Sequence, residues 1–331
     1  MGEFDLIARY FTRPARRAAL GVGDDCALLA PAPGMQLAVS SDMLVEGRHF
    51  FAGTDPEALG HKALAVNLSD LAACGARPLA FTLALALPKV DEPWLAAFAR
   101  GLLALADAHG CELVGGDTTA GPLNLCITVF GEVAQGDALK RSGARAGDDV
   151  WVSGAPGQAR LALDALRSAW RLPEAVLATA RARLERPTPR VALGLALRGV
   201  ATSCIDVSDG LLGDLAHVLD ASGVGATIEV TPTTALIAAS ACPTSAGALF
   251  DAETLPLTST QLQGCVLAGG DDYELVFTAP PARRALVRAA GAASATRVTR
   301  IGRIEAQPGL RLTNAEGQPV PNDFAGFDHF A

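Results

Sequence analysis

The chain has 331 residues, half of them apolar, and its 27 basic and 35 acidic residues give a net charge of −8. This length suits two domains, and the apolar fraction allows each of them to bury a core. The negative charge argues against nucleic acid or an anionic membrane surface as a partner. Because no run of about 18 uncharged apolar residues occurs, we expect no membrane-spanning helix.

The compartment is indicated by the first residues and by the cysteines. Glu3 and Asp5 lie where a secretory signal would be basic and then apolar, so no such signal is expected. The seven cysteines form no CxxC pair. They are interpreted as reduced thiols that pack in the core, and neither as a zinc site nor as a redox pair. These features predict a cytoplasmic protein.

Helical and strand patterns alternate through the first half of the chain. The dipeptide Asp55-Pro56 after Thr54 is typical of a helix start. Helices are expected at 4–11, from Pro56 to near Gly75 and at 94–109, and strands after the turn 21–25 and at 36–39, 81–87, 111–114 and 123–133. The glycine-rich segment 136–147 is the expected passage between two domains, 1-138 and 139-331.

The second half shows the same alternation. Strands are expected at 149–153, 227–230 and after the glycine turn 269–270, and helices up to about Arg198, through Leu215 and Val218, and near the end of the chain. The segment 238–261 has no clear period and receives no assignment. Both halves therefore predict α/β domains.

The stretch 40–50, Ser-Ser-Asp-Met-Leu-Val-Glu-Gly-Arg-His-Phe, follows the apolar residues 36–39. Open α/β sheets place their chemistry just beyond the carboxyl ends of the strands. We therefore interpret Ser40, Ser41 and Asp42 as a functional strand end, although any single Ser-Asp pair is ordinarily a polar turn or a cap.

Carboxylates recur at glycine or serine turns beside apolar segments. A Ser-Asp pair occurs at 41–42, 69–70 and 208–209, and a Gly-Gly-Asp turn at 115–117 and 269–271. Each acid alone could be a helix cap, but the set predicts one shared site. The acids of this set are Asp24, Asp25, Asp42, Asp70, Asp117, Asp206, Asp209, Asp271 and Asp272.

Like charges gathered in a cleft require cations. The chain has only three lysines, Lys62, Lys89 and Lys140, and Lys62 is expected to be a solvated helix residue. Hard oxygen ligands on several loops are typical of Mg²⁺ shared with substrate phosphates. The glycine pairs Gly115-Gly116 and Gly269-Gly270 would let backbone N–H groups approach anions closely. The P-loop, the His-Arg-Asp catalytic loop and the dinucleotide-binding glycine motif are absent.

These motifs resemble the thiamine-monophosphate kinase family of the PurM-like superfamily, whose members include aminoimidazole-ribonucleotide synthetase. The resemblance covers essentially the whole chain. Its segments are GVGDDCALL, SSDMLVEGRHF, KALAVNLSDLAACGARP, GGDTT, RSGARAGD, DVSDGLLGDL and GGDDYELVF.

The resemblance implies ATP-dependent, direct in-line phosphorylation of thiamine monophosphate to thiamine diphosphate. It also implies a homodimer of two-domain α/β subunits, whose N-terminal mixed sheets pair into a barrel. Carried over by motif, the Mg²⁺ ligands are Asp25, Ser40, Ser41, Asp42, Asp70, Asp117, Asp206 and Asp209, of which Asp42, Asp70, Asp117 and Asp209 are taken as catalytic. ATP would contact Gly116, Asp117, Arg141 and Ser208, and thiamine monophosphate would contact His49, Asp271 and Phe327.

Two positions depart from the family pattern, which usually has glutamate at position 271 and tyrosine or tryptophan at position 327. Asp271 is one methylene shorter, and Phe327 keeps a stacking surface without a polar group. His49 could also be a metal ligand, but imidazole suits Mg²⁺ poorly.

Two other functions remain open. One is a different ATP-dependent synthetase of the superfamily, which would need another substrate loop. The other is a non-catalytic binding module for a divalent metal. A calcium-binding module places its ligands within one short segment, whereas these acids are spread over about 250 residues.

Overall fold

The computed structural model describes residues 2–23, 25–239, 251 and 255–324. The chain forms two compact units. One unit comprises Met1–Leu71 and Ala76–Gly136, and the other comprises Ala72–Gly75 and Asp137–Ala331.

The first unit is built on a four-stranded mixed sheet in the order β1-β4-β2-β3. Its strands are β1 (Met35–Val45), β2 (Arg77–Leu87), β3 (Glu112–Ala120) and β4 (Asn124–Ala134). β4 pairs antiparallel with both β1 and β2, whereas β2 and β3 are parallel. The parallel pair requires a crossover, which a helix between the two strands provides.

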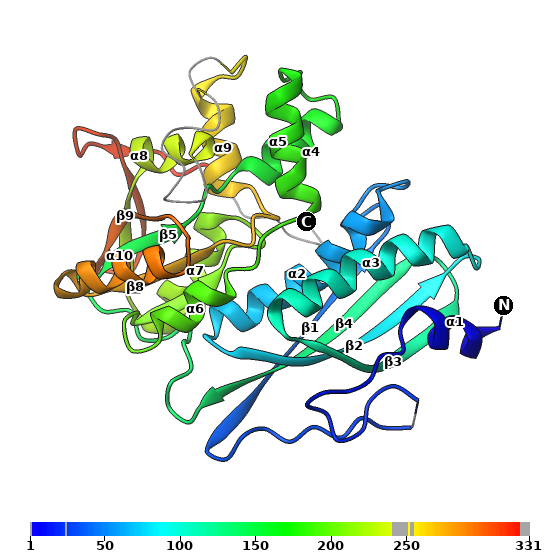
Figure 1. Ribbon diagram of the computed structural model, residues 1–331. Helices are drawn as coiled ribbons and strands as arrows, with labels where there is room; N and C mark the ends of the chain where they lie inside the picture. The colour runs from blue at the N-terminus through cyan, green and yellow to red at the C-terminus, as the bar shows by residue number, and fades with distance from the viewer. Residues whose placement is uncertain (1, 24, 240–250, 252–254, 325–331) are drawn as a thin grey trace. The chain divides into compact units, whose positions relative to one another are not determined.

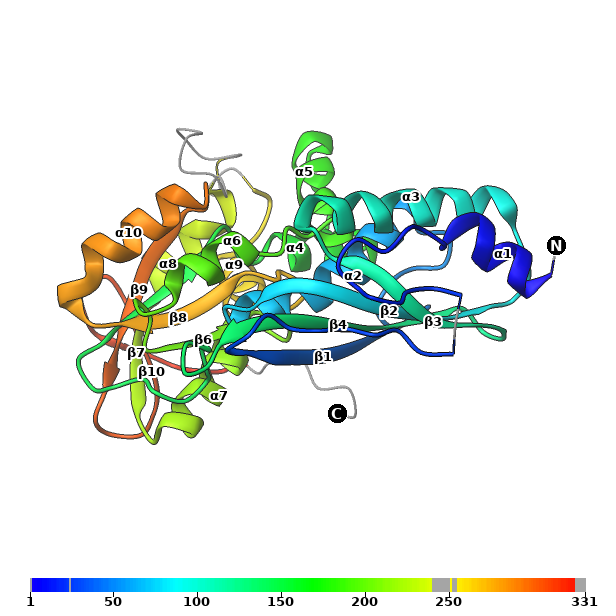
Figure 2. The same cartoon turned by 60° about the horizontal axis from the view of Figure 1, so that its bottom comes forward.

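Helices α2 (Pro56–Ala73) and α3 (Glu92–His109) cover one face of this sheet (Figure 2). Helix α3 begins at Glu92, two residues before the expected start at 94, and the side chain of Asp91 caps it by accepting a hydrogen bond from the Trp94 N–H at 3.1 Å. Gly60 on α2 and Gly101 on α3 let the two helices approach closely. A Cβ added at Gly60 would lie 2.1 Å from the carbonyl oxygen of Phe98. The short helix α1 (Glu3–Tyr10) precedes the sheet.

The residues of β1 alternate between the two faces of the sheet. Ser40, Asp42 and Leu44 are half-buried or buried on the helix-covered face. The opposite face of β1 exposes large apolar side chains, between 37% and 58% accessible: Met35, Leu37, Val39, Met43 and Val45. We call these five residues the open apolar row.

The predicted end of the first strand is wrong. β1 does not stop at Val39 but continues through Ser40, Ser41 and Asp42 to Val45. An edge strand with one open face tolerates polar side chains, so polarity did not mark the strand's end. The strand expected after the turn 21–25 is reduced to an isolated bridge between Leu20 and Leu28.

The second unit contains a seven-stranded mixed sheet in the order β11-β10-β7-β9-β5-β8-β6. β7 and β10 are parallel, and the other paired strands are antiparallel. The strands are β5 (Asp149–Ser153), β6 (Ser203–Asp206), β7 (Gly225–Glu229), β8 (Leu275–Ala279), β9 (Val298–Glu305), β10 (Gly309–Thr313) and β11 (Pro319–Val320).

Helices accompany this sheet in two packed groups. Leu211, Leu215 and Val218 of α7 belong to the larger core, together with strand residues such as Val152 and Val276. Helices α4, α5 and α9 contribute to a second core. The helices are α4 (Gln158–Leu166), α5 (Glu174–Glu185), α6 (Val191–Leu197), α7 (Leu211–Ser222), α8 (Val230–Thr234), α9 (Ser259–Ala268) and α10 (Arg284–Ala293), with 3₁₀ turns η1 (Ala235–Ala238) and η3 (Pro281–Arg283).

The strand expected after the second glycine turn is confirmed as β8, which begins at Leu275. Residues 266–268, before the turn, are the last turn of α9. Most of 238–261, which received no assignment, lies outside the described residues.

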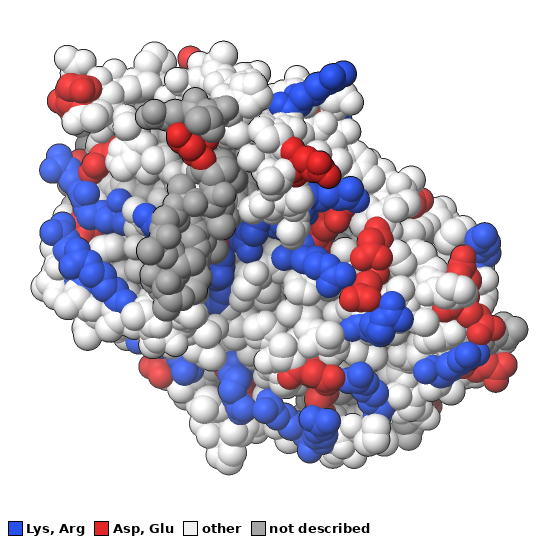
Figure 3. All heavy atoms as spheres, turned by 45° about the horizontal axis from the view of Figure 1, so that its top comes forward, with Lys and Arg blue, Asp and Glu red and all other residues white. Residues whose placement is uncertain are grey.

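Surface features bear on the predicted partners. Within the described part of the chain, no helix has the length and apolar character needed to cross a membrane. On the face drawn in Figure 3, acidic groups lie among the basic ones over much of the surface. Cys26 and Cys74 are exposed, which contradicts the interpretation of all cysteines as core residues, whereas Cys111, Cys204 and Cys265 are buried.

Candidate active site

One group of predicted site residues gathers between β1 and the end of α2. The hydroxyl of Ser40 donates to Oδ2 of Asp70 at 2.5 Å. The Asp42 N–H donates to Oδ1 of Asn67 at 3.1 Å, and the Asn67 amide in turn donates to the Ala63 carbonyl at 3.0 Å. Asn67 and Asp70 lie three residues apart on one face of α2, as predicted, and this face contacts the middle of β1.

The chemistry of this group fits a hard cation. Asp42 and Asp70 are only half-buried, so their carboxylates keep access to solvent. The oxygen of Asn67 already accepts the Asp42 N–H, so Asn67 orients the strand. Among the described residues, no three His, Cys, Asp or Glu side chains surround a common point. Two carboxylates and a hydroxyl suit Mg²⁺, which ordinarily completes its shell with water and phosphate oxygens.

Ser41 is directed to the other face of the sheet. Its hydroxyl lies 3.0 Å from the Thr128 hydroxyl and donates to the Ile127 carbonyl at 3.2 Å. Ser40 and Ser41, adjacent in sequence, are therefore on opposite faces of β1, as the two-residue period of a strand requires.

Asp117 lies on β3, at the opposite edge of the sheet from Asp42. Asp42 shares a row of the sheet with the buried Ile127 and Leu83. Asp117 shares the next row with the exposed Ala84. The two aspartates are three strand spacings apart, about 14 Å, and face different sides of the sheet. A single copy of this unit does not bring them together.

Gly116 has a packing role. A Cβ at this position would lie 1.9 Å from the Leu83 carbonyl oxygen, so glycine is required for the close approach of β3 to β2. Asp25 is exposed in the loop that the Leu20–Leu28 bridge closes. Asp24 lies outside the described residues.

His49 is held in a tight turn at the end of β1. Its Nδ1 accepts the Val45 N–H at 3.0 Å, and Gly47 in the turn has a φ of 78°. Because Nδ1 accepts, the neutral imidazole carries its proton on Nε2, which is therefore a donor.

Lys62 is buried, at 4% exposure, and its ammonium donates to the His49 carbonyl at 3.5 Å. The expectation of a solvated lysine is therefore wrong. The neighbours of Lys62 at helical spacing, Leu59 and Val66 among them, are apolar and buried, and the turn that contacts its ammonium lies thirteen positions earlier in the chain. Lys62 thus supports the backbone of the turn that carries His49.

In the second unit, Asp206, Ser208 and Asp209 lie in the loop between β6 and α7. Asp214, in the first turn of α7, reaches back and accepts the N–H groups of Ser208, Asp209 and Gly210 at 3.0, 3.1 and 3.1 Å. Burial and the charge of Asp209 raise the pKa of Asp214 to about 6, against the lowering effect of these three bonds. Asp214 therefore shapes the loop that presents Ser208 and Asp209.

The Gly269–Gly270 turn brings Asp271 next to this loop. The Asp271 N–H donates to the Ser208 carbonyl at 2.8 Å, and the Tyr273 N–H donates to the Val207 carbonyl at 2.9 Å. A Cβ at Gly270 would lie 2.4 Å from the same Ser208 oxygen. Glycine is needed here because the two loops are in contact. The sequence alone predicts a site of anion binding at the same glycine.

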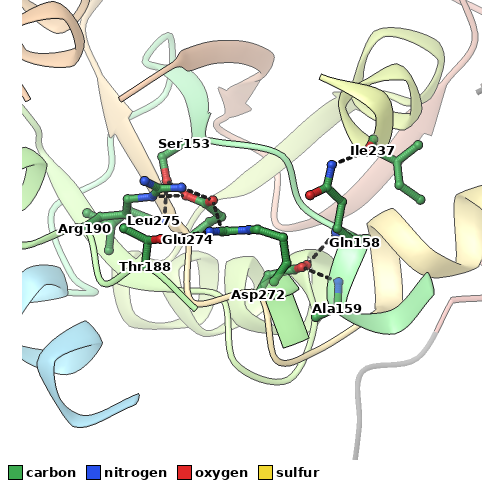
Figure 4. Close-up of polar contacts among 11 residues, drawn as sticks. Ser153, Gln158, Ala159, Thr188, Arg190, Ile237, Asp272, Glu274 and Leu275 are labelled. Carbon is green, nitrogen blue, oxygen red and sulfur yellow. Dashed lines mark hydrogen bonds and ion pairs between the residues drawn. The ribbon is translucent and has the colours of Figure 1, made fainter. Parts of the chain in front are cut away.

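Asp272 and Glu274, which follow Asp271 in the chain, belong to a buried polar network that the sequence did not reveal (Figure 4). Glu274, fully buried, accepts two hydrogen bonds from Arg190, at 2.6 and 2.5 Å, and one from Arg183 at 2.8 Å. Burial raises the pKa of Glu274, but the charges of Arg190 and Arg183 outweigh it, so the pKa lies below its ordinary value. The sequence did contain one signal for this network. In Asp271-Asp272-Tyr273-Glu274 the acids Asp272 and Glu274 are two positions apart, so they can share one side of an extended segment.

Asp272 belongs to the same interior. Its carboxylate accepts the Gly157 N–H at 2.7 Å and the Ala159 N–H at 3.4 Å, at the start of α4. Burial, with the charge of Glu274, raises the pKa of Asp272 to about 8 against the effect of these bonds. Asp272 is thus a remote cap of α4.

Arg141 and Ser208 lie near opposite ends of β6. The side chain of Arg141 is exposed, and its carbonyl accepts the hydroxyl of Ser222, the last residue of α7. The carbonyl of the preceding Lys140 accepts the Cys204 N–H at 2.9 Å near the start of β6, whereas Ser208 follows the end of this strand. Phe327 lies outside the described residues.

Comparison with known proteins identifies the family. Residues 23–133 match the N-terminal domain of AIR synthase related proteins, and residues 146–314 match their C-terminal domain. The thiamine-monophosphate kinase of Salmonella typhimurium is 45% identical over 336 aligned residues, covering 100% of this chain and 98% of the relative.

Solved structures agree with these matches. The thiamine-monophosphate kinase of Stenotrophomonas maltophilia K279a is 41% identical, with a TM-score of 0.78 over 96% of each chain. AaThiL complexed with AMPPCP and TMP is 28% identical, with a TM-score of 0.71 over 91% of this chain and 89% of that chain. The two-unit PurM-like α/β fold is thereby confirmed, and this chain belongs to the thiamine-monophosphate kinase family.

Proposed function

We propose that this protein is a thiamine-monophosphate kinase, which transfers the γ-phosphoryl group of ATP to thiamine monophosphate. The bond from the γ-phosphorus to the departing ADP breaks as a terminal phosphate oxygen of thiamine monophosphate forms the new bond, giving thiamine diphosphate. The observation that carries this proposal is the end-to-end similarity to a curated enzyme of this name at 45% identity. The AaThiL complex with AMPPCP and TMP supports both substrates.

The residues fit a mechanism of positioning and charge neutralisation. The acceptor oxygen belongs to a phosphate that is largely ionised at neutral pH, so a strong general base is not required. Asp42, Asp70 and Ser40 would hold Mg²⁺ in the first unit, and Asp206 and Asp209 in the second, with Asp25, Ser41 and Asp117 as further ligands. Bound Mg²⁺ supplies positive charge that neutralises the phosphate oxygens during transfer.

The remaining site residues bind and orient the two substrates. His49 donates its Nε2–H to thiamine monophosphate, and the carboxylate of Asp271 accepts a hydrogen bond from the amino group of its pyrimidine. Phe327 gives the ring an apolar surface. Gly116, Asp117, Ser208 and Arg141 contact the nucleotide. Positioning of this kind lowers the barrier by fixing both reactants before reaction.

The active protein is proposed to be a homodimer. The open apolar row on β1 is too large an exposed stripe for an isolated sheet face, and an edge strand presents unpaired backbone groups. A second copy that places its β3 edge beside β1, with the two sheets closed into a barrel around their open faces, would cover this row. It would also bring the Asp117 of one copy to the β1 edge of the other, which one chain alone does not do. With ATP as its phosphoryl donor, we place the enzyme in the cytoplasm.

The test is a transfer assay with γ-labelled ATP, Mg²⁺ and thiamine monophosphate. Labelled thiamine diphosphate, formed with one ADP per product, is expected. Turnover of a purine-pathway or selenium substrate with no thiamine diphosphate would instead indicate another synthetase of the superfamily. Metal binding without any turnover would indicate a non-catalytic metal-binding protein.

A further inference from the structure

The segment Asp271–Glu274 joins a half-buried carboxylate to two buried ones. The Tyr273 phenol donates to Oδ1 of Asp271 at 3.0 Å, so these two side chains support each other. Asp272 and Glu274, the alternate residues, are 4% and 0% exposed. Side chains that alternate in this way couple the position of Asp271 to contacts made in the interior.

Both carboxylate oxygens of Glu274 accept hydrogen bonds from charged or polar groups. The two guanidinium groups of Arg190 and Arg183 meet its carboxylate, and the Ser153 hydroxyl donates to Oε2 at 2.5 Å (Figure 4). Buried charges require partners of good geometry, and the planar fork of arginine restricts that geometry further. The carboxylate of Glu274 therefore has one position.

These contacts attach the segment to several elements. Arg183 lies near the end of α5, Arg190 immediately before α6, and Ser153 at the end of β5. There is no spare room around the carboxylate, because a Cβ added at Gly154 would lie 1.9 Å from Oε1 of Glu274. Glu274 thus connects the end of α5, the start of α6 and the end of β5 to the turn that contains Asp271.

The turn itself has an unfavourable backbone. Asp271 and Tyr273 have φ values of 66° and 51°, in the left-handed region that side chains other than glycine avoid. Such conformations persist only when their surroundings determine them. Here the determinants are the backbone bonds to the 207–208 segment on one side and the Glu274 network on the other.

We propose that Glu274, Arg190 and Arg183 together hold the Asp271–Glu274 turn in the position in which Asp271 contacts thiamine monophosphate. The inference rests on the proposed function only through the role of Asp271. Nucleotide binding is spared, because the N–H groups of Ser208 and Asp209 keep their bonds to Asp214, although the Ser208 carbonyl also accepts the Asp271 N–H. The network therefore sets affinity for thiamine monophosphate and leaves affinity for ATP unchanged.

The kinetic test uses Glu274→Gln, which keeps the size of the side chain and removes its charge. The KM for thiamine monophosphate is expected to rise at least tenfold, while the KM for ATP and kcat change less than twofold. The matched control is Glu185→Gln on α5, a half-buried glutamate that pairs with the exposed Arg181 at 2.7 Å, and it should change neither KM. Equal increases in both KM values, or a loss of kcat alone, would overturn the positioning role.

A second variant serves if Glu274→Gln does not fold. Arg183→Gln leaves the Arg190–Glu274 pair intact and should raise the KM for thiamine monophosphate about threefold. Arg183→Lys, which restores the charge, should return it toward the wild-type value. An unchanged KM for thiamine monophosphate in Arg183→Gln would contradict the proposal that these residues position Asp271.

Hydrogen exchange provides a readout that does not depend on turnover. In Glu274→Gln, or in Arg183→Gln where the first variant does not fold, the amides of Asp271 and Tyr273 should exchange faster. Those of Ser208 and Asp209, which Asp214 holds, should not. Unchanged exchange at residues 271 and 273 would show that the network does not hold the turn. If the wild type fails to phosphorylate thiamine monophosphate, the proposed function fails, and the exchange experiment still decides whether the network holds Asp271.

Discussion

The hydroxyl of Ser40 and the carboxylate of Asp70 are joined by a 2.5 Å hydrogen bond between the middle of an edge strand and the end of a helix. Thirty residues separate them in the chain. The bond fixes where the helix ends relative to the strand, and it places the Asp70 carboxylate on the same face of the sheet as Asp42. The first half of the proposed site is thus built by one contact between β1 and α2.

Asp42→Asn should abolish phosphoryl transfer without unfolding the protein. The bond to Asn67 is made by the backbone N–H of Asp42, so it survives the substitution, whereas the negative charge is lost. We expect kcat to fall by at least about 100-fold, as measured with γ-labelled ATP, with an unchanged circular dichroism spectrum. Asp107→Asn, which removes an exposed pair with Arg13, is the control and should keep full activity. Full activity in Asp42→Asn would refute the ligand role.

Lys62→Met should weaken binding of thiamine monophosphate. Methionine fills much of the same buried space but cannot donate to the His49 carbonyl, so the turn carrying the imidazole loses a support. The KM for thiamine monophosphate should rise about fivefold, roughly 1 kcal/mol, with the KM for ATP unaffected. The control, Lys89→Met, changes an exposed lysine. A selective rise in the KM for ATP would assign Lys62 to the nucleotide side instead.

Asp214→Ala should destabilise the second unit strongly. Three backbone N–H groups lose their acceptor at once, and Gly210, at the N-cap position of α7, has no side chain that could replace it. The free energy of unfolding in urea should fall by about 3 kcal/mol. Asp220→Ala, on the exposed side of the same helix, should change it by less than about 0.5 kcal/mol. Similar stability of the two variants would contradict the capping role.

Asp149 should make stability depend on pH in the acid range. Burial raises the pKa of this carboxyl, but hydrogen bonds and charges from Arg284 and Arg300 outweigh it, so the folded-state pKa lies below 3.8. A lowered pKa contributes stability above the unfolded-state value, and this contribution is lost as the pH falls through the folded-state value. Wild type should therefore exceed Asp149→Asn in unfolding free energy at pH 5 to 8. In urea titrations, this difference in unfolding free energy should shrink below about pH 4. A difference that grows on acidification would contradict the lowered pKa of Asp149.

Val39→Lys should disrupt the proposed dimer. The side chain of Val39 is 58% exposed in the middle of the open apolar row, where a lysine would be buried unpaired by a second copy. Sedimentation should show monomers and a large loss of transfer activity. Leu286→Lys, at a 53% exposed position on α10, is the control and should stay dimeric. A monomeric wild type with full activity would exclude the dimer.

Local patterns predicted much of the fold. The capped helix α3, the α2 face carrying Asn67 and Asp70, and the strands β2, β4 and β5 follow from periodicity, caps and breakers. Where the prediction of β1 stopped too early, the cause was its position at a sheet edge, where a polar residue can alternate with an apolar one without ending the strand.

The site was predictable only in part, because its supports are non-local. Motifs identified Ser208 and Asp271 as functional candidates but did not reveal that their backbones are hydrogen-bonded. The burial of Lys62 depends on the turn at His49, and Glu274 finds its arginines 84 and 91 positions earlier in the chain. Periodicity within a window of about 11 to 18 residues does not reveal the contacts of Glu274, whose partners lie far outside such a window.

The missing side chain at Gly154 has a consequence for how this enzyme can change over generations. The volume that a methyl group would occupy there already holds a carboxylate oxygen of Glu274. A residue other than glycine at 154 would force a shorter, uncharged residue at 274, and two arginines would then lose their counter-charge in the interior. We therefore expect the residues at positions 154, 183, 190 and 274 to change together in related sequences. A single replacement at position 154 that keeps the protein folded would contradict this expectation.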